Sequence, residues 1–247
     1  MCIIDLTNKT FVVTGAGSGI GRATATVLSK EGARLILIDL SQEGLDETMI
    51  LLEGDEHISK RFDLTYFDAL PVLTKEIISE IGPVDGLVHC AGISSRKPLN
   101  VLRPDGFSKV MDVNFYSFEE LTRLFTKKGN MNDGGSIVVM SSISSIKGYK
   151  AKTEYCVSKA AVDAFVRCMA LELAPRSIRI NSIMPAEVNT PLAAQARELN
   201  EALGKIPEAQ PLGITEPREV ANVIAFLLSD ATHTISGTSI KMGGVCF

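Results

Sequence analysis

Residues 14–21 read Thr14-Gly15-Ala16-Gly17-Ser18-Gly19-Ile20-Gly21, and this stretch decides the fold. An apolar run at 10–14 precedes it and a helical pattern at 20–31 follows directly. Glycines let the backbone turn sharply and approach a ligand closely, and a helix start offers free N–H groups and a positive dipole to a diphosphate. This strand–turn–helix unit predicts a dinucleotide site. Its expected contact residues are Gly15, Ser18, Gly19, Ile20 and Gly21.

Strand-like runs alternate with helical patterns along the whole chain. The expected strands are 10–14, 34–38, 57–62, 84–89, 136–142, 178–184 and 238–242. The expected helices are 20–31, 42–53, 66–81, 105–128, 153–174 and 216–229. Strands that are apolar on both faces are typical of parallel sheets covered by helices. The sequence therefore predicts an α/β fold with a single domain over 1–247: a Rossmann-type, doubly wound parallel sheet of about seven strands with helices on both faces.

The composition excludes several classes of protein. Of 247 residues 45% are hydrophobic, and the net charge of −4 gives no reason to expect nucleic-acid binding. The apolar runs are far shorter than a membrane span, and the N-terminus lacks a secretory pattern, so no membrane role is expected. Five cysteines without a Cys-x-x-Cys pair indicate reduced thiols in a cytoplasm. Three scattered histidines indicate no metal site.

The second strand ends in a carboxylate that fits the adenosine half of a dinucleotide. Asp39 lies 18 residues after Gly21, near the spacing of ~20 expected for the acid that binds ribose hydroxyls. Its charge would repel a 2′-phosphate, and Leu40 offers no compensating cation, so NAD is expected in preference to NADP. Asp39 would alternatively cap the next helix, although Ser41 is available for that role.

The third and fourth strands end in further candidates for the cofactor site. Asp63, followed by Leu64, is expected beside the adenine, where its carboxylate would accept an amino hydrogen. A cap on the following helix is an equally good role for Asp63. The fourth strand ends in Cys90-Ala91-Gly92, whose small side chains would let a cofactor lie against the sheet edge.

Tyr155 and Lys159 form the candidate chemical centre. They lie four residues apart at the start of an Ala-rich helical run, and therefore on one helix face. An ammonium beside a phenol stabilises its anion, so the Tyr155 pKa is expected to fall and the side chain to exchange protons near neutral pH. On this motif alone, the alternative interpretation is a surface pair of side chains without a chemical role.

Taken together, these motifs resemble a classical short-chain dehydrogenase/reductase from about Leu6 to Gly244. Ser142 stands 13 residues before the tyrosine, the usual spacing of the family's serine. Asn114 matches its asparagine, and the run Arg179 to Pro185 matches the segment that ends its sixth strand.

The resemblance implies a role for each matched residue. Tyr155 would be the general acid or base, Ser142 would hold the substrate oxygen, Lys159 would hold the nicotinamide ribose, and Asn114 would anchor a proton-relaying water. The cofactor would supply the hydride. The residues expected around the nicotinamide are Pro185, Val188 and Thr190.

Two departures from the family pattern stand out. His89-Cys90-Ala91-Gly92 replaces the family's Asn-Asn-Ala-Gly, and Cys90 would remove a polar brace of the sheet. Ala186 replaces a glycine after Pro185, and its methyl group would narrow the nicotinamide pocket.

Three segments should line the substrate side: 93–98, 143–152 and 190–212. The last is the expected lid, because Leu192, Ala196, Leu199 and Leu203 repeat at helical spacing, although a helix packed on the body fits equally well. Cations cluster near this mouth and would attract an anionic substrate, or be ordinary solvated loop residues. They are Arg96, Lys97, Lys147, Lys150 and Lys152.

The resulting hypothesis is an NAD(H)-dependent oxidoreductase that interconverts a secondary alcohol and a ketone, with a small molecule as its substrate. An NADPH-type 3-oxoacyl-acyl-carrier-protein reductase is a rival, with Lys127, Lys128 and Arg176 near where such enzymes dock a carrier. A non-catalytic, cofactor-sensing protein is another. The family also implies a homo-oligomer, a tetramer or dimer, through the helices at 105–128 and 153–174.

Overall fold

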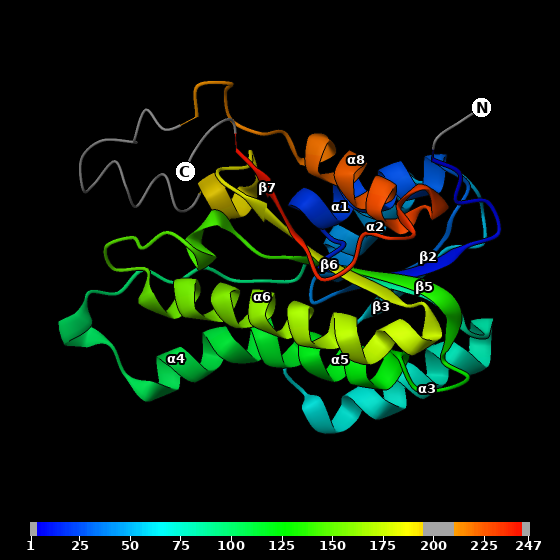
Figure 1. Ribbon diagram of the computed structural model, residues 1–247, viewed down its shortest axis with the longest axis horizontal. Coiled ribbons are helices and arrows are strands. Elements are labelled where there is room, and N and C mark those ends of the chain that lie inside the picture. Colours follow the sequence, from blue (N-terminus) through cyan, green and yellow to red (C-terminus); the bar gives the residue numbers. More distant parts are fainter. Residues whose placement is uncertain (1–3, 195–209, 244–247) are drawn as a thin grey trace.

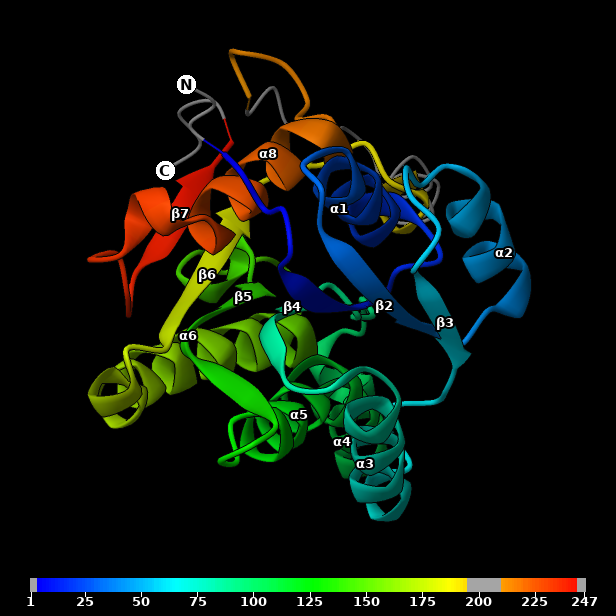
Figure 2. The ribbon, with the colours of Figure 1, turned by 90° about the vertical axis from the view of Figure 1, so that its right-hand side faces the viewer.

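The computed structural model describes residues 4–194 and 210–243. They form a sheet of seven parallel strands in the order β3-β2-β1-β4-β5-β6-β7. Helices cover both faces of this sheet (Figures 1 and 2), so the predicted fold class is confirmed. The chain runs outward from β1 to β3 and resumes with β4 on the other side of β1. Ligands of such sheets bind beyond the carboxyl ends of the strands at this reversal, here between β1 and β4.

The strands agree with the sequence prediction except at some ends. They are β1 (Thr10–Thr14), β2 (Arg34–Asp39), β3 (Ile58–Arg61), β4 (Val84–His89), β5 (Met131–Met140), β6 (Arg179–Pro185) and β7 (Ser239–Met242). The largest difference is β5, which begins at Met131 instead of Ser136. Val84 pairs with Met131 but Gly86 pairs with Ser136, so the added residues form an irregular start rather than a regular ladder.

The helices are α1 (Gly19–Lys30), α2 (Gln42–Ile50), α3 (Leu70–Ile81), α4 (Pro104–Met111), α5 (Ser117–Phe125), α6 (Thr153–Leu173) and α8 (Pro217–Leu228). The helix predicted over 105–128 is present as one unbroken helical run over 104–125, but it is not a regular α-helix throughout. A π-helical turn, η3 (Asp112–Tyr116), separates α4 from α5. Such turns carry an extra residue and occur often at functional sites. Asn114 lies in the middle of this one.

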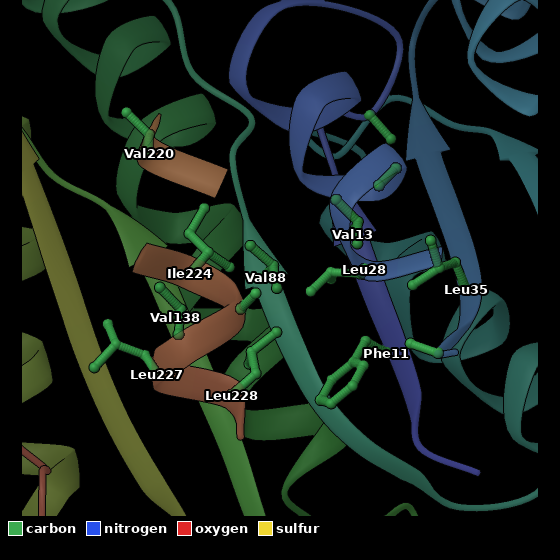
Figure 3. Close-up of a cluster of buried hydrophobic side chains, with 14 of the residues drawn as sticks. Phe11, Val13, Leu28, Leu35, Val88, Val138, Val220, Ile224, Leu227 and Leu228 are labelled. Carbon is green, nitrogen blue, oxygen red and sulfur yellow. The ribbon is translucent and has the colours of Figure 1, made fainter. Parts of the chain in front are cut away.

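Two hydrophobic cores lie on opposite faces of the sheet. Alternate strand residues point to opposite faces, so Phe11 and Val13 pack in one core while Val12 packs in the other. The first core joins β1 to α1 and α8, where Ile224 meets the sheet (Figure 3). The second includes Phe118 of α5 and side chains of α3 and α6. Apolar strands buried on both sides fix the sheet, and therefore the edge where its carboxyl ends meet.

Most of the predicted lid, including residues 195–209, lies outside the described residues. Among the helices of the described ranges, none has the length and apolar character needed to cross a bilayer. Within 4–194 and 210–243, His, Cys, Asp and Glu side chains form no group of three suited to a metal ion.

Candidate active site

The glycine-rich turn leaves no room for side chains at two of its positions. Gly15 has φ of 65°, and a Cβ there would stand 2.7 Å from the Ala91 backbone nitrogen. A Cβ at Gly21 would stand 2.0 Å from the Gly15 carbonyl oxygen. The turn is therefore held tightly against the end of β4 and the start of α1. This close packing fits the glycine pattern of a dinucleotide site.

The N-terminus of α1 has neither a side-chain cap nor an acidic residue of its own. Ser18 is its N-cap, but the hydroxyl makes no capping hydrogen bond, and the first turn has no acidic residue. Thr190, after β6, lies against the same turn, because a Cβ at Gly19 would be 3.3 Å from its methyl carbon. The glycine-rich turn and Thr190, which are far apart in the sequence, thus meet beside one helix N-terminus, a position that favours a bound anion.

Asp39 faces the glycine-rich turn. Its carboxylate accepts hydrogen bonds from the N–H groups of Gly17 at 2.9 Å and Ser41 at 2.9 Å. The alternative role as helix cap falls to Ser41, whose hydroxyl accepts the Gly44 N–H at 3.0 Å. The carboxylate therefore stands at the end of β2 beside the turn, where a ribose would lie.

The sequence interpretation missed a cation in this neighbourhood. Arg61 pairs in register with Asp39 across β2 and β3, and its Nε donates to the Leu40 carbonyl at 3.2 Å. Its guanidinium therefore lies beside Leu40, the position at which no cation was expected to balance a 2′-phosphate. Arg22, which also reaches the turn, is engaged by Glu47 at 2.6 Å. The register of β3 against β2 supplies Arg61, and a single sequence does not give that register.

Asp63 makes a local turn. Its Oδ1 accepts hydrogen bonds from the Thr65 N–H at 2.9 Å and the Thr65 hydroxyl at 2.7 Å. Leu64 beside it is buried. Asp63 does not cap the following helix, because the N-cap positions of the next two helical segments are Tyr66 and Ala69. Its contact with an adenine stays a prediction.

The brace expected to be lost at Cys90 is supplied by its neighbour His89. Thr14 Oγ1 lies 2.9 Å from His89 Nδ1, and Ser117 Oγ lies 3.4 Å from His89 Nε2. The imidazole thus joins β1 to α5 through β4. Burial, with help from the charge of Lys159, lowers the pKa of His89 to about 3, so the ring is neutral. Burial also raises the pKa of the Cys90 thiol to about 12, which makes it an unreactive packing group.

Asn114 and Lys159 converge on Gly92. A Cβ at Gly92 would lie 3.3 Å from Asn114 Oδ1 and 3.5 Å from Lys159 Nζ. Asn114 is fixed by three hydrogen bonds: it accepts from the Ile93 N–H at 2.8 Å and donates to the Ile93 carbonyl at 3.0 Å and to Ser158 Oγ at 3.0 Å. The π-helical turn thus aims a buried amide at the end of β4.

Tyr155 and Ser142 form the other half of this group. A hydrogen bond from Ser142 favours the phenolate, but burial has the larger effect, and the Tyr155 pKa is raised above its usual value. The expectation that Lys159 lowers this pKa is therefore wrong for the described geometry. The Lys159 ammonium lies 5.8 Å from the Tyr155 ring centroid and donates to the Met140 carbonyl at 2.8 Å. The shared helix face brought the two side chains close, and the ammonium makes its hydrogen bond to the Met140 carbonyl.

A buried carboxylate behind Lys159 was not found from the sequence. Asp163 accepts hydrogen bonds from Ser141 at 2.8 Å, Ser182 at 2.6 Å and Ser239 at 3.3 Å. Burial lowers the pKa of Lys159 to about 8, and the charge of Asp163 opposes that effect. Its position four residues after Lys159 on α6 was the available signal.

The remaining departure is Ala186, whose methyl group was expected to narrow the nicotinamide pocket but contacts another part of the chain. A Cβ at Gly243 would stand 2.4 Å from the Ala186 Cβ, so this methyl group faces the end of β7. Val188, also predicted at the nicotinamide, is buried in the first core. Pro185 closes β6.

Comparison with known proteins gives the same picture over the whole chain. A family model described as enoyl-(acyl carrier protein) reductase matches residues 15–244. The 3-oxoacyl-[acyl-carrier-protein] reductase FabG of Thermotoga maritima is 34% identical over 248 residues, covering 97% of this chain and 98% of that protein. An NAD-dependent glycerol dehydrogenase of Listeria innocua is 30% identical over 242 residues, covering 97% and 94%. A solved short-chain dehydrogenase/reductase from Serratia marcescens has a TM-score of 0.89 at 26% identity, covering 97% and 98%.

The chain belongs to the short-chain dehydrogenase/reductase family.

As a member of this family, it is an oxidoreductase that acts on hydroxyl or keto groups. The sequence resemblance to the short-chain dehydrogenases is thereby confirmed. The relatives named above are dehydrogenases and reductases, and none of these names supports the non-catalytic alternative.

Proposed function

We propose that this short-chain dehydrogenase interconverts a secondary alcohol and a ketone with NAD(H), and that Tyr155 is its general acid and base. The observation that carries the proposal is one convergence at the carboxyl edge of the sheet. The Ser142 hydroxyl lies near enough to Tyr155 to favour its phenolate, while Asn114 and Lys159 meet beside Gly92. The glycine-rich turn touches the same end of β4.

The cofactor, when bound, would supply or accept the hydride. The chain's own residues hold and move the proton. Tyr155 would donate its hydroxyl proton to the carbonyl oxygen during reduction and accept it back during oxidation. Ser142 would hold the same oxygen by a hydrogen bond. Lys159 would bind the ribose hydroxyls, and Asn114 would hold a water that connects Lys159 to solvent.

The preference for NAD rests on Asp39. Its carboxylate stands beside Gly17 and would repel a 2′-phosphate. The name of the Listeria innocua relative, an NAD-dependent glycerol dehydrogenase, supports the same choice. Arg61 is the group that would oppose it, because its guanidinium is anchored at Leu40. Titration of the protein with NADH and NADPH, followed by nicotinamide fluorescence, tests the choice; tighter binding of NADPH would overturn it.

A panel of secondary alcohols and ketones, assayed by the absorbance of the reduced nicotinamide, tests the activity itself. Turnover of at least one small alcohol or ketone with NAD(H) is expected. If the protein binds the cofactor but reduces and oxidises nothing in a broad panel, the cofactor-sensing alternative replaces the enzyme.

Reduction of a 3-oxoacyl group on an acyl carrier protein is the second candidate, because the Thermotoga maritima relative carries that name. One of the three expected docking cations is already engaged. Arg176 Nε lies 2.7 Å from Asp133, and the same guanidinium donates to the Met131 carbonyl at 2.6 Å. Lys127 and Lys128 are exposed. The same 3-oxoacyl group, offered on the carrier and on a small thiol, separates the two candidates: a preference of more than about tenfold for the carrier would favour the second.

We also propose a cytoplasmic homo-oligomer, a tetramer or dimer. An apolar stripe at helical spacing is exposed on α6, formed by Val157, Ala160, Ala164, Cys168 and Leu171. Leu171 is 80% exposed, an unusual position for a large apolar side chain on a monomer. Light scattering should show two or four copies, and Leu171→Glu should shift the population toward the monomer.

A further inference from the structure

The mouth of the site contains two cations that neighbouring carboxylates leave incompletely compensated. We define the mouth as residues 93–98 and 143–152, because the Lys97 N–H donates to the Ala151 carbonyl at 2.7 Å and holds the two segments together. Five cations lie on these segments, and the structure separates them. Lys97 is paired with buried Glu154 at 3.5 Å. Lys147 and Lys150 are exposed. Arg96 and Lys152 are the two that remain.

Arg96 carries a buried donor without a partner. Its Nη1 is shielded from solvent and makes no hydrogen bond to any residue that the structure describes. Buried guanidinium donors are nearly always bonded, because leaving one unmade loses its solvation without replacement. Such a donor indicates a place where a ligand supplies the missing acceptor. A guanidinium suits carboxylate and phosphate oxygens best, since its N–H groups form a planar fork.

Lys152 is held in an unfavourable position for a cation. It is the N-cap of α6, where the helix dipole is positive, and it makes no side-chain capping bond there. Its pKa is lowered by burial and further by the charge of Arg96, which is opposed by the charges of Cys156 and Glu187. The two cations therefore sense each other. A bound anion would interact favourably with the positive end of the helix dipole, and it would reduce the repulsion between Arg96 and Lys152.

The distance to the catalytic tyrosine sets the size of the substrate. Lys152 Nζ lies 5.9 Å from the Tyr155 ring centroid and 5.4 Å from the Tyr149 ring centroid. A reacting carbonyl oxygen must come within ~3 Å of the Tyr155 hydroxyl to receive its proton. An anionic group bound at Lys152 is therefore separated from the reacting carbon by only a few bonds.

We propose that Arg96 and Lys152 form an anion subsite, and that the physiological substrate is a short hydroxy or oxo compound with a carboxylate or phosphate close to the reacting carbon. This inference rests on the proposed dehydrogenase function and adds its substrate class. It differs from a merely basic surface, because Arg96 and Lys152 are partly buried at the mouth whereas Lys150, on the same segment, is exposed.

The first test compares matched substrates. Short 2- and 3-oxo acids are assayed against their methyl esters, and hydroxyacetone phosphate against hydroxyacetone, with NADH. The two pairs distinguish a carboxylate from a phosphate. Arg96→Met should lower kcat/KM for the preferred anionic substrate by about 10- to 100-fold, the usual effect of one charged hydrogen bond, and leave the neutral partner nearly unchanged. Lys150→Met removes the same charge from an exposed site and should change neither.

The second test needs no turnover. Calorimetric titration with malonate and with inorganic phosphate should show binding to the wild type and to Lys150→Met, and weaker binding to Arg96→Met and Lys152→Met. Thermal unfolding of each variant shows whether it is folded, and Arg96→Lys, which keeps the charge, should recover part of the binding.

The outcomes separate the two proposals. Anion binding that depends on Arg96, without turnover of any substrate, would keep the subsite and overturn the dehydrogenase assignment. The opposite outcome would be turnover of neutral ketones, an equal effect of Arg96→Met on acids and on their esters, and no anion binding in the titration. That outcome would overturn the subsite and keep the dehydrogenase.

Discussion

The two sides of the crevice differ in how their charged groups are satisfied. On the glycine-rich side, Asp39 accepts two backbone N–H groups, and Arg22 is paired with Glu47 at 2.6 Å. On the mouth side, Arg96 Nη1 is buried without a hydrogen bond within residues 4–194 and 210–243, and burial lowers the pKa of Lys152. A satisfied site is already organised for its ligand, whereas unmatched charges gain their partners from the ligand. This difference indicates that the glycine-rich side is preorganised before its ligand binds, whereas the mouth needs a ligand to supply the missing hydrogen-bond acceptor.

Lys159 stands between the two sides, and its loss should have the largest effect. In Lys159→Met the ammonium that faces Gly92 is absent, so both cofactor affinity and kcat should fall, the latter by about 10²- to 10³-fold as for other lost electrostatic groups. Steady-state kinetics with fluorescence titration of NADH measures both quantities. Lys150→Met, on the exposed loop, is the control. A variant with normal kcat would mean that Lys159 belongs only to the fold.

Asp39 tests the glycine-rich side alone. Asp39→Asn removes the charge beside Gly17, so the preference for NADH over NADPH should fall by about 10- to 100-fold, since two charges at contact differ by that much in a medium of intermediate dielectric. Dissociation constants for both cofactors measure the ratio. Asp55→Asn, at an exposed position, should leave it unchanged. An unaltered ratio in Asp39→Asn would transfer the choice of cofactor to other groups, with Arg61 the first to examine.

His89 tests the support beneath both sides. Its pKa falls from 6.5 to about 3 on folding, so the folded state binds fewer protons than the unfolded state below pH 6.5. Its contribution to stability is complete above pH 6.5 and should be lost by about 1.4 kcal/mol per pH unit as the pH falls toward 3.

Urea unfolding of the wild type and of His89→Gln across this pH range measures that slope. Glutamine keeps a donor and an acceptor but does not titrate, so the slope of the variant should be smaller by the stated amount. Parallel curves would mean that His89 is not held neutral in the fold.

Tyr155 offers the smallest and sharpest comparison, because the sequence and the structure predict opposite shifts. Burial raises its pKa above the usual value of 10, in spite of the Ser142 hydrogen bond. Difference absorbance of the phenolate, wild type minus Tyr155→Phe, should therefore show ionisation only above pH 10. Ionisation of this group near neutral pH would restore the original expectation that Lys159 makes the phenol acidic.

Local patterns were enough to predict the sheet and the glycine-rich turn, because strand periodicity placed β1 and β4. The helical spacing of Tyr155 and Lys159 put those two side chains near each other, whereas the candidates Asn114 and Ser142 came from the family resemblance. Contacts between distant segments were not accessible in that way. Asp163 receives its hydroxyl groups from β6, β7 and the end of β5, and Arg61 reaches Leu40 through strand register.

The direction in which a side chain points was the other feature that the sequence pattern could not predict. The four-residue spacing correctly put Tyr155 and Lys159 together, but the Met140 carbonyl takes the ammonium. A continuous periodic pattern over 105–128 likewise concealed the π-helical turn at Asn114, because one extra residue barely disturbs an apolar pattern.

The transfer of deuterium tests the central claim most directly. With NADH deuterated at the transferred position and any ketone found active in the panel, mass spectrometry should find the label on the carbinol carbon of the product. Tyr155→Phe should bind NADH as the wild type does but form labelled product about 10²- to 10⁴-fold more slowly, because the phenol proton is missing. Equal rates in the two proteins would contradict the account, since hydride transfer would then proceed without Tyr155.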